Sequence, residues 1–383
     1  MQTIALHLPQ FHPVAQNDAW WGAGFTEWTN VAKARPVVPG HYQPHLPADL
    51  GFYDLRLAET RAAQAALARQ YGVSGFCYYH YWFTGERILE RPVNDMVALG
   101  QPDFPFCLCW ANENWTRTWD GRSGQVLLAQ NYSDADDQQH IEALIPYFSD
   151  RRYIRVDGRP LFLVYRTELM PDPRRTADIW RKAAQKAGLG DLFLVRVEGF
   201  VQDVDPASIG FDAALEFAPD WQRVGQIHFS RWQHVLSYLG LFPKGYFDHR
   251  FADYRKMVAQ MLDKPEPPYA RYRCVTPGFD NSARRKKEAT IFLHNTPDAY
   301  QAWLAEMARR ELANSRPANQ KLVFINAWNE WAEGNHLEPD QKWGHAYLEA
   351  TQGALASSEL AANQSANQSA NQPANLPANV DVS

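Results

Sequence analysis

The stretch "KLVFINAWNEWAEG", residues 321–334, joins a short apolar run to a motif with two tryptophans and two glutamates. A short apolar run that ends in polar residues is typical of a buried strand. Seven similar runs precede it: 3–8 "TIALHL", 73–79 "VSGFCYY", 105–110 "PFCLCW", 161–165 "LFLVY", 192–197 "LFLVRV", 213–217 "AALEF" and 272–276 "YRCVT". The sequence therefore predicts eight buried strands, the last of them over 322–327.

Segments with helical spacing and good helix formers separate these runs. They include 54–71, 135–148, 174–187, 249–262, 298–313 and 343–356, and Asp54, Asp172–Pro173 and Thr296–Pro297 are helix-opening signals. Buried strands that alternate with helices form a parallel sheet, and eight such units predict a (β/α)8 TIM barrel. A doubly wound open sheet is the alternative, but no GxGxxG turn follows the first strand.

The predicted barrel is a single domain over residues 1–357. Within it, 221–248 fits the repeat poorly and predicts a helical insertion after the sixth strand. Residues 358–383 repeat Ala, Asn, Gln and Ser or Pro with almost no large apolar residue, which predicts a disordered low-complexity tail.

Composition argues against several classes of function. The formal net charge is −5, and the one short basic cluster is "ARRKK" at 283–287, so nucleic acid is not an expected partner. Residues 1–12 contain no apolar stretch long enough to span a membrane and no basic start of a secretion signal, so we expect a cytoplasmic protein. The four cysteines, Cys77, Cys107, Cys109 and Cys274, lie in apolar runs and are expected to be buried thiols. No metal or cofactor is expected, and the sequence gives no oligomeric state.

The loops that follow the barrel strands are where a TIM barrel places its chemistry. Polar and aromatic residues recur there, and the candidate substrate-binding residues are Gln10, His12, Tyr79, His80, Trp82, Trp110, Asn112, Glu113, Trp115, Tyr165, Glu216, Asp280, Trp328 and Asn329. Aromatic faces pack against sugar rings while carboxylates and amides bind hydroxyls, so the expected partner is an oligosaccharide or polysaccharide. Three alternatives stay open: a structural His80, a loop-capping Glu113, and a Glu198 that pairs with Arg196 or Arg166.

The candidate catalytic residues are Glu330 and Glu333. On a helical turn, residues three apart share one face with Cβ atoms about 5–6 Å apart, whereas in an extended loop they point apart. Mutual repulsion and the neighbouring Trp328 and Trp331 favour one protonated carboxyl near neutral pH, which gives one acid and one base. The alternative is that both glutamates serve the N-terminus of a short helix.

"NAWNEWAEGNHLEPD", with "LHLPQFHP", "WWGAGFTEW", "LGFYDLR", "GFCYYHYWF" and "WANENW", resembles the WbsX-like family of bacterial polysaccharide-locus proteins. That family is similar to the endo-α-mannosidases of glycoside hydrolase family 99. The resemblance covers about residues 3–350 and implies a (β/α)8 barrel without a metal. It also implies roles: Glu330 as base toward the sugar's own 2-hydroxyl, which forms a 1,2-anhydro intermediate, and Glu333 as acid and then base.

The sequence and this resemblance leave three candidate functions. The first is a retaining glycoside hydrolase acting on α-linked mannose or rhamnose of a bacterial polysaccharide. The second is a glycosyltransferase of O-antigen or capsule synthesis, for which the sequence offers only the weak "DVD" at 203–205 as a metal–diphosphate motif. The third is a non-catalytic carbohydrate-binding protein.

Overall fold

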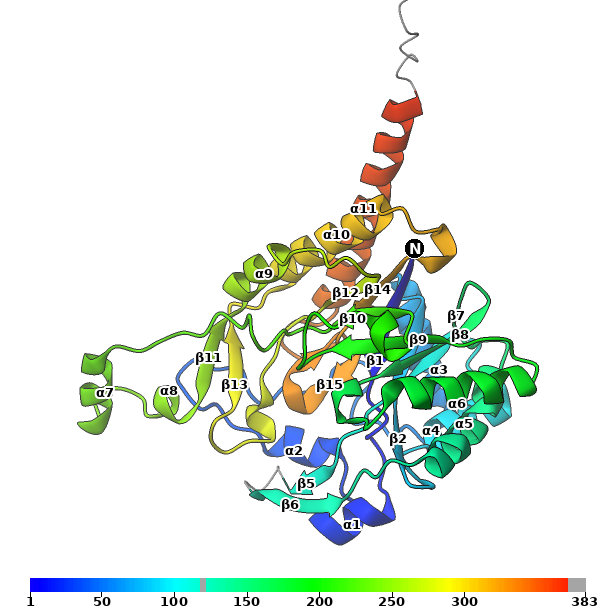
Figure 1. Ribbon diagram of the computed structural model, residues 1–383. Coiled ribbons are helices and arrows are strands. Elements are labelled where there is room, and N and C mark those ends of the chain that lie inside the picture. The colour runs from blue at the N-terminus through cyan, green and yellow to red at the C-terminus, as the bar shows by residue number, and fades with distance from the viewer. Residues whose placement is uncertain (118–121, 371–383) are drawn as a thin grey trace, which may run out of the picture.

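The eight predicted runs form the strands of a closed parallel barrel in a computed structural model that describes residues 1–117 and 122–370 (Figure 1). The strands are β1 (Gln2–His7), β2 (Gly75–Phe83), β4 (Phe106–Trp110), β8 (Arg159–Val164), β9 (Phe193–Glu198), β10 (Ala213–Glu216), β12 (Arg271–Val275) and β14 (Leu322–Ile325). Each pairs with the next in chain order, and β14 pairs with β1. The barrel prediction is confirmed, and the open-sheet alternative is wrong because the pairing of β14 with β1 closes the ring and leaves no edge among the eight strands.

Helices lie around the barrel: α3 (Ala58–Gln70), α4 (Arg91–Leu99), α5 (Asp134–Phe148), α6 (Pro173–Lys186), α9 (Tyr254–Leu262), α10 (Pro297–Ala313) and α11 (Ala346–Ala370). Two opening signals are confirmed, because the side chains of Asp172 and Thr296 accept hydrogen bonds from backbone N–H groups in the first turns of α6 and α10. The third is wrong. Asp54 accepts from the backbone and side chain of Arg56 in a local turn, and α3 begins only at Ala58.

The long connections carry further elements. The loop after β1 contains α1 (Ala15–Trp21) and α2 (Glu27–Lys33), and the predicted insertion 221–248 contains α7 (Arg231–Tyr238) and α8 (Gly245–Asp248). Smaller sheets are formed by β3 (Glu86–Ile88) on β2, β7 (Arg155–Val156) on β8, β5 (Trp115–Arg117) with β6 (Arg122–Leu128), β11 (Arg250–Asp253) with β13 (Thr290–Leu293), and β15 (Asn329–Glu330) with β16 (Asn335–His336). Figure 1 shows α7 at the left edge of the view, away from the barrel helices.

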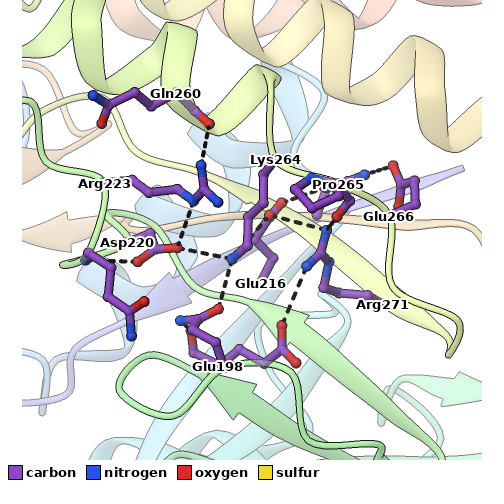
Figure 2. Close-up of polar contacts among 12 residues, drawn as sticks. Glu198, Glu216, Asp220, Arg223, Gln260, Lys264, Pro265, Glu266 and Arg271 are labelled. Atoms are coloured by element: carbon purple, nitrogen blue, oxygen red, sulfur yellow. Dashed lines mark hydrogen bonds and ion pairs between the residues drawn. The ribbon is translucent and has the colours of Figure 1, made fainter.

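The fifth strand-to-strand connection contains a short 3₁₀ turn, η3 (Pro206–Ile209), in place of a helix. In β9, Val195 and Val197 face into the barrel. Arg196 and Glu198 alternate with them on the outer face and are almost fully buried. They belong to a buried ionic cluster that also contains Glu216, Asp220, Lys264, Arg271 and Arg273. Figure 2 shows Lys264 between Asp220 and Glu216, and Arg271 between Glu216 and Glu198. Charges thus fill the outer face of the barrel that a covering helix would otherwise bury.

The last helix passes the predicted domain boundary at residue 357. The Oγ of Ser358 donates to the backbone oxygens of Ala305 on α10 and Ala354, and this side chain is buried. The start of the Ala/Asn/Gln-rich segment is therefore helical as far as Ala370, because it is rich in helix formers and rests on α10. The remainder of the predicted tail, 371–383, lies outside the described residues.

Two further observations concern sequence expectations. All four cysteines are buried free thiols, as predicted. In the part of the chain that the structure describes, no helix combines the length and apolar character that a membrane crossing requires.

Candidate active site

A cavity of about 770 Å³ opens at the carboxyl ends of the barrel strands. Its wall is made by residues at or just beyond the ends of successive strands, among them Leu8, Tyr79, Ala111, Tyr165, Phe217 and Asn326. Seven sequence-predicted residues line it: Gln10, Tyr79, Glu113, Trp115, Tyr165, Glu330 and Glu333. The cavity has the size and the polar–aromatic character of a small-molecule site.

Both candidate glutamates reach the cavity from one tight loop. Glu330 ends β15, the 3₁₀ turn η6 spans Trp331–Glu333, and β16 returns antiparallel to β15. In a 3₁₀ turn, side chains three residues apart eclipse one another, so Glu330 and Glu333 share one side. Glu330 stands at the N-cap of this turn but makes no side-chain cap hydrogen bond. The capping alternative is therefore not supported for Glu330.

Gly334 ends this turn in the left-handed region, with φ of 55°. A Cβ atom at this position would lie 3.0 Å from the Cβ of Asp280 and 3.3 Å from the ring of His45. The backbone N–H of Asp280 donates to the carbonyl oxygen of Glu333 at 2.5 Å. The loop that carries the two glutamates is thus pressed against the segment that follows β12.

Arg284 bridges the two glutamates. Its Nη1 lies 2.6 Å from Oε1 of Glu333, and its Nη2 lies 3.2 Å from Oε2 of Glu330. The same Nη2 lies 3.2 Å from Oε2 of Glu27, a fully buried residue of α2. Although burial opposes the charged form, these carboxylates hold the pKa of Arg284 above its usual value. The guanidinium therefore stays charged and fixes both carboxylates.

The proton in this group resides on Glu330 near neutral pH. Burial, and then the charge of Glu333, raise the pKa of Glu330 to about 8 against the opposing effect of Arg284. Burial also raises the pKa of Glu27. The expectation of one protonated carboxyl in the pair agrees with this electrostatic arrangement.

Aromatic rings form much of the remaining wall. They come from Tyr79, Tyr81, Trp115, Tyr165, Phe200, Phe217, Trp221 and Phe279. Glu113 forms an ion pair with Arg166, whose guanidinium lies 3.8 Å from the ring centroid of Phe200. Glu113 is thus held as an ion-paired wall residue, and the loop-capping alternative is not needed to explain it.

Nine predicted residues do not line the cavity: His12, His80, Trp82, Trp110, Asn112, Glu216, Asp280, Trp328 and Asn329. Of the nine, His80, Trp82 and Trp110 lie on the outer faces of β2 and β4, where they pack around His140 of α5. The structural alternative for His80 therefore holds. Glu216 also faces outward, because it is paired in register with Glu198 and bonded to Arg273 at 3.0 Å.

The alternative reading of Glu198 is confirmed, since its Oε1 lies 2.9 Å from Nη1 of Arg196. His12 is buried beside the cavity, and burial lowers its pKa to about 4. Asp280 accepts hydrogen bonds from Gln43 and from Ser282 N–H, and it pairs with His41. These side chains shape the surroundings of the cavity without lining it.

The remaining predicted residues outside the cavity wall hold the loops around the cavity in place. The amide of Asn112 binds the backbone of Arg166, and the amide of Asn329 binds both the N–H and the carbonyl of Leu8. The indole of Trp328 donates to Oε1 of Glu338 at 2.8 Å. Asn112, Asn329 and Trp328 therefore affect the site indirectly, by fixing the loops around it.

Glu338 is a supporting residue that the sequence analysis did not single out. Its buried carboxylate accepts hydrogen bonds from the indoles of Trp328 and Trp331, the hydroxyl of Tyr53 and the amide of Gln64. Burial raises the pKa of Glu338 to about 7 against these four donors. The two tryptophans of the motif are therefore anchored below the cavity and do not serve as sugar platforms.

The sequence analysis missed two cavity residues, Tyr81 and Arg284, that a sequence signal could have identified. Tyr81 stands two positions beyond Tyr79, so the period of a strand places both rings on one face. Arg284 belongs to the basic cluster 283–287 just after β12, where the barrel keeps its functional loops. Glu27 had no such signal, because it lies in a helix of the first long loop.

Among the described residues, the group His45, His336 and Asp340 has donor atoms close enough to hold a metal ion. None of the three lines the cavity.

Comparison with solved structures matches the whole barrel. A family 99 endo-α-mannosidase from Bacteroides thetaiotaomicron, solved with bis-tris-propane, aligns with a TM-score of 0.55 at 13% identity over 95% of this chain and 98% of that one. A protein described as glycoside hydrolase-like gives 0.57 at 13% identity over 92% and 93%. At this identity the likeness concerns the fold.

Sequence comparison finds closer relatives. The uncharacterized protein WxcX from two strains of Xanthomonas campestris pv. campestris is 45% identical over 361 residues, which is 94% of this chain. The chain spans about half the length of these relatives, 50% in each case. The family described as Glycosyltransferase WbsX matches residues 3–351, which span the barrel and the loops of the candidate site. With this match over nearly the whole described barrel, the chain belongs to the glycosyltransferase WbsX family.

Proposed function

We propose that the chain is a carbohydrate-active enzyme that cleaves α-linked mannose or rhamnose residues of a bacterial polysaccharide, with retention of configuration. The observation that carries this proposal is the pair Glu330 and Glu333, held by Arg284 at an aromatic-walled cavity with one proton between them. A proton donor and a proton acceptor at one cavity are the requirement for acid–base cleavage of a glycosidic bond.

The placement of both carboxylates on one short turn favours participation of the substrate's own 2-hydroxyl. In the first step, the Glu330 carboxylate takes the 2-hydroxyl proton and the sugar O2 attacks C1. The bond from C1 to the leaving oxygen breaks, and Glu333 donates its proton to that oxygen. In the second step, the Glu333 carboxylate takes a proton from water, which opens the 1,2-anhydro ring while Glu330 returns its proton to O2.

This route restricts the substrate. The sugar O2 must stand on the face opposite the leaving group, as it does in α-mannose and α-rhamnose. Neither glutamate then has to reach C1 as a nucleophile, so both can come from one loop. Burial favours the proton on Glu330 in the unliganded site, so the first step requires that this proton pass to Glu333 when the substrate binds.

The test is a screen of defined α-mannosides and α-rhamnosides with the wild type, Glu330→Gln and Glu333→Gln. Proton NMR of the product reports the anomeric configuration, and retention is expected. Fluoride is a leaving group that needs no protonation, so Glu333→Gln should cleave a glycosyl fluoride far better than a glycan. Glu330→Gln should cleave neither substrate. Full wild-type activity in either variant on a glycan would contradict the proposal.

A second candidate, glycosyl transfer, is favoured by the description of the family itself. The "DVD" segment gives it little support, because Asp205 caps η3 through the backbone of Ala207 and none of residues 203–205 lines the cavity. Transfer from a nucleotide sugar to a glycan acceptor, without free sugar as a product, would place this candidate first. Binding of glycans without turnover, unchanged by loss of either glutamate, would instead indicate a binding protein.

A further inference from the structure

Three side chains that could bind a metal meet behind the catalytic loop. Nδ1 of His45 lies 3.0 Å from Nε2 of His336, and Oδ2 of Asp340 lies 4.0 Å from the first and 3.8 Å from the second. All three residues are buried. Four-coordinate zinc with nitrogen ligands at about 2.0–2.1 Å sets neighbouring ligands about 3.3 Å apart, so small side-chain shifts would complete such a site.

Each of two donors is already oriented toward the centre of the group. The Nδ1 of His336 lies 2.9 Å from the carbonyl oxygen of Glu338, so it acts as the donor to that oxygen and Nε2 turns its lone pair toward His45. Oδ1 of Asp340 accepts the backbone N–H groups of Lys342 and Trp343, which leaves Oδ2 facing the two imidazoles. A ring nitrogen held by a backbone carbonyl is the usual support of a metal-binding histidine.

Two further observations point to a cation. Among the residues that the structure describes, no Lys or Arg lies within ion-pair distance of the buried carboxylate of Asp340. The ring of Tyr42 packs on His45 with centroids 4.2 Å apart, and its buried hydroxyl lies close to the carboxylate of Asp340. The phenol supplies a fourth oxygen near the group.

We propose that His45, His336 and Asp340 bind one divalent transition-metal ion of the zinc class, with Tyr42 or water as the fourth ligand. Two imidazoles and a carboxylate are ligands that zinc accepts. Binding would require His45 to carry its proton on Nε2 in place of Nδ1, a change of tautomer without loss of charge. The ion would tie the loop at residue 45 to β16, the strand that pairs with the catalytic Glu330 segment. The inference does not depend on the proposed function.

The test uses the full chain, freed of metal by a chelator. Titration with Co²⁺ should give the visible d–d absorption of a four-coordinate site at one ion per chain, and Zn²⁺ should displace it. Zn²⁺ should raise the melting temperature by about 3 °C or more, since a ligand that binds the folded state stabilises it. X-ray absorption of the zinc-loaded wild type should count two imidazole ligands.

His336→Gln and Asp340→Asn should each weaken metal binding by more than about tenfold. The matched control is His294→Gln, because His294 forms a His–Asp pair with Asp253 at 2.9 Å on the surface and should leave binding unchanged. Absence of both the absorption and the melting shift in the wild type overturns the proposal. So does absorption that persists in both ligand variants. If the variants do not fold, an imidazole count other than two in the wild type has the same consequence.

Discussion

Arg284 is the side chain on which the charge balance of the candidate site depends. Three carboxylates, from Glu27, Glu330 and Glu333, lie within 3.2 Å of its guanidinium. One positive charge cannot offset three negative charges in a buried site, so the site retains a proton. The more buried member of the catalytic pair, Glu330, takes that proton. The acid–base asymmetry of the pair follows from burial of Glu330 together with the shared cation.

The pH dependence of kcat/KM should report this proton. The reaction needs one proton on the pair, because Glu333 must donate it to the leaving oxygen, so kcat/KM should be level just below about pH 8 and fall about tenfold per pH unit above it. The value belongs to the coupled pair as a whole. The measurement is a pH profile with a neutral substrate. A profile that rises up to pH 8 and then levels off would show that no proton on the pair is needed.

Removal of the Arg284 charge should damage both stability and activity. Arg284→Met leaves Glu27 buried without this cation, and breaking a buried ion pair costs about 3–5 kcal/mol. The variant should also raise the pKa of Glu330 further, which moves the falling limb of the pH profile to higher pH. Urea unfolding and the pH profile measure the two effects.

Arg285→Met is the adjacent control for this variant. Arg285 also lines the cavity and is half-buried, but its guanidinium binds only the carbonyl of Glu288 among the contacts of the described residues. Its replacement should leave the unfolding midpoint nearly unchanged. Equal destabilisation by the two variants would show that the effect of Arg284 does not come from its buried ion pairs.

At the scale of the element, the two-residue period of the strands decides which predicted residues reach the cavity. Inward positions end in Tyr79 and Tyr81 on β2, whereas His80 and Trp82 alternate with them and face α5. Trp110 and Glu216 fall on outward positions for the same reason. Strand parity was available in the sequence, but only pairing register fixes which parity faces inward.

The η6 turn should fail if Gly334 acquires a side chain. Gly334→Ala adds a Cβ 3.0 Å from that of Asp280 at a left-handed φ of 55°, so Glu333 should be displaced and kcat should fall at least about tenfold. Gly344→Ala is the matched control. Gly344 has φ of 52° and open space around its absent Cβ, so that variant carries the backbone strain alone.

The measurement is kcat for both glycine variants beside their melting temperatures. Equal loss of kcat in Gly334→Ala and Gly344→Ala would rule out the contact with Asp280 as the cause. An unchanged kcat in Gly334→Ala would show that the loop tolerates displacement.

At the scale of the whole molecule, the barrel replaces one covering helix with a buried ionic cluster. The cluster joins β9, β10 and β12 to Lys264 in the segment after α9 (Figure 2). An outward-facing strand surface normally buries apolar side chains under a helix. Here, opposite charges on neighbouring strands pair with one another. Removal of one charge leaves its partner buried and unpaired, which is costly.

Glu216→Gln should therefore destabilise the fold without affecting the cavity. Glu216 is 0% exposed and contacts Arg273 at 3.0 Å, and loss of its charge should cost about 3–5 kcal/mol of unfolding free energy. KM of the folded variant should stay at the wild-type value. The exposed pair of Asp134 and Arg175 provides the control, and Asp134→Asn should not move the urea midpoint. A raised KM in Glu216→Gln would instead indicate that Glu216 takes part in substrate binding, as the sequence analysis predicted.

The sequence by itself determined the eight strands, most of the helices and the position of the glutamate motif after the last strand, because apolar periodicity and capping residues act over short distances. Tertiary structure decided which side chains face the cavity. It also brought Arg284 onto Glu27, 257 positions away, and His45 onto His336. These meetings depend on barrel closure and on the course of the long loops. The course of the long loops leaves no local signal in the chain.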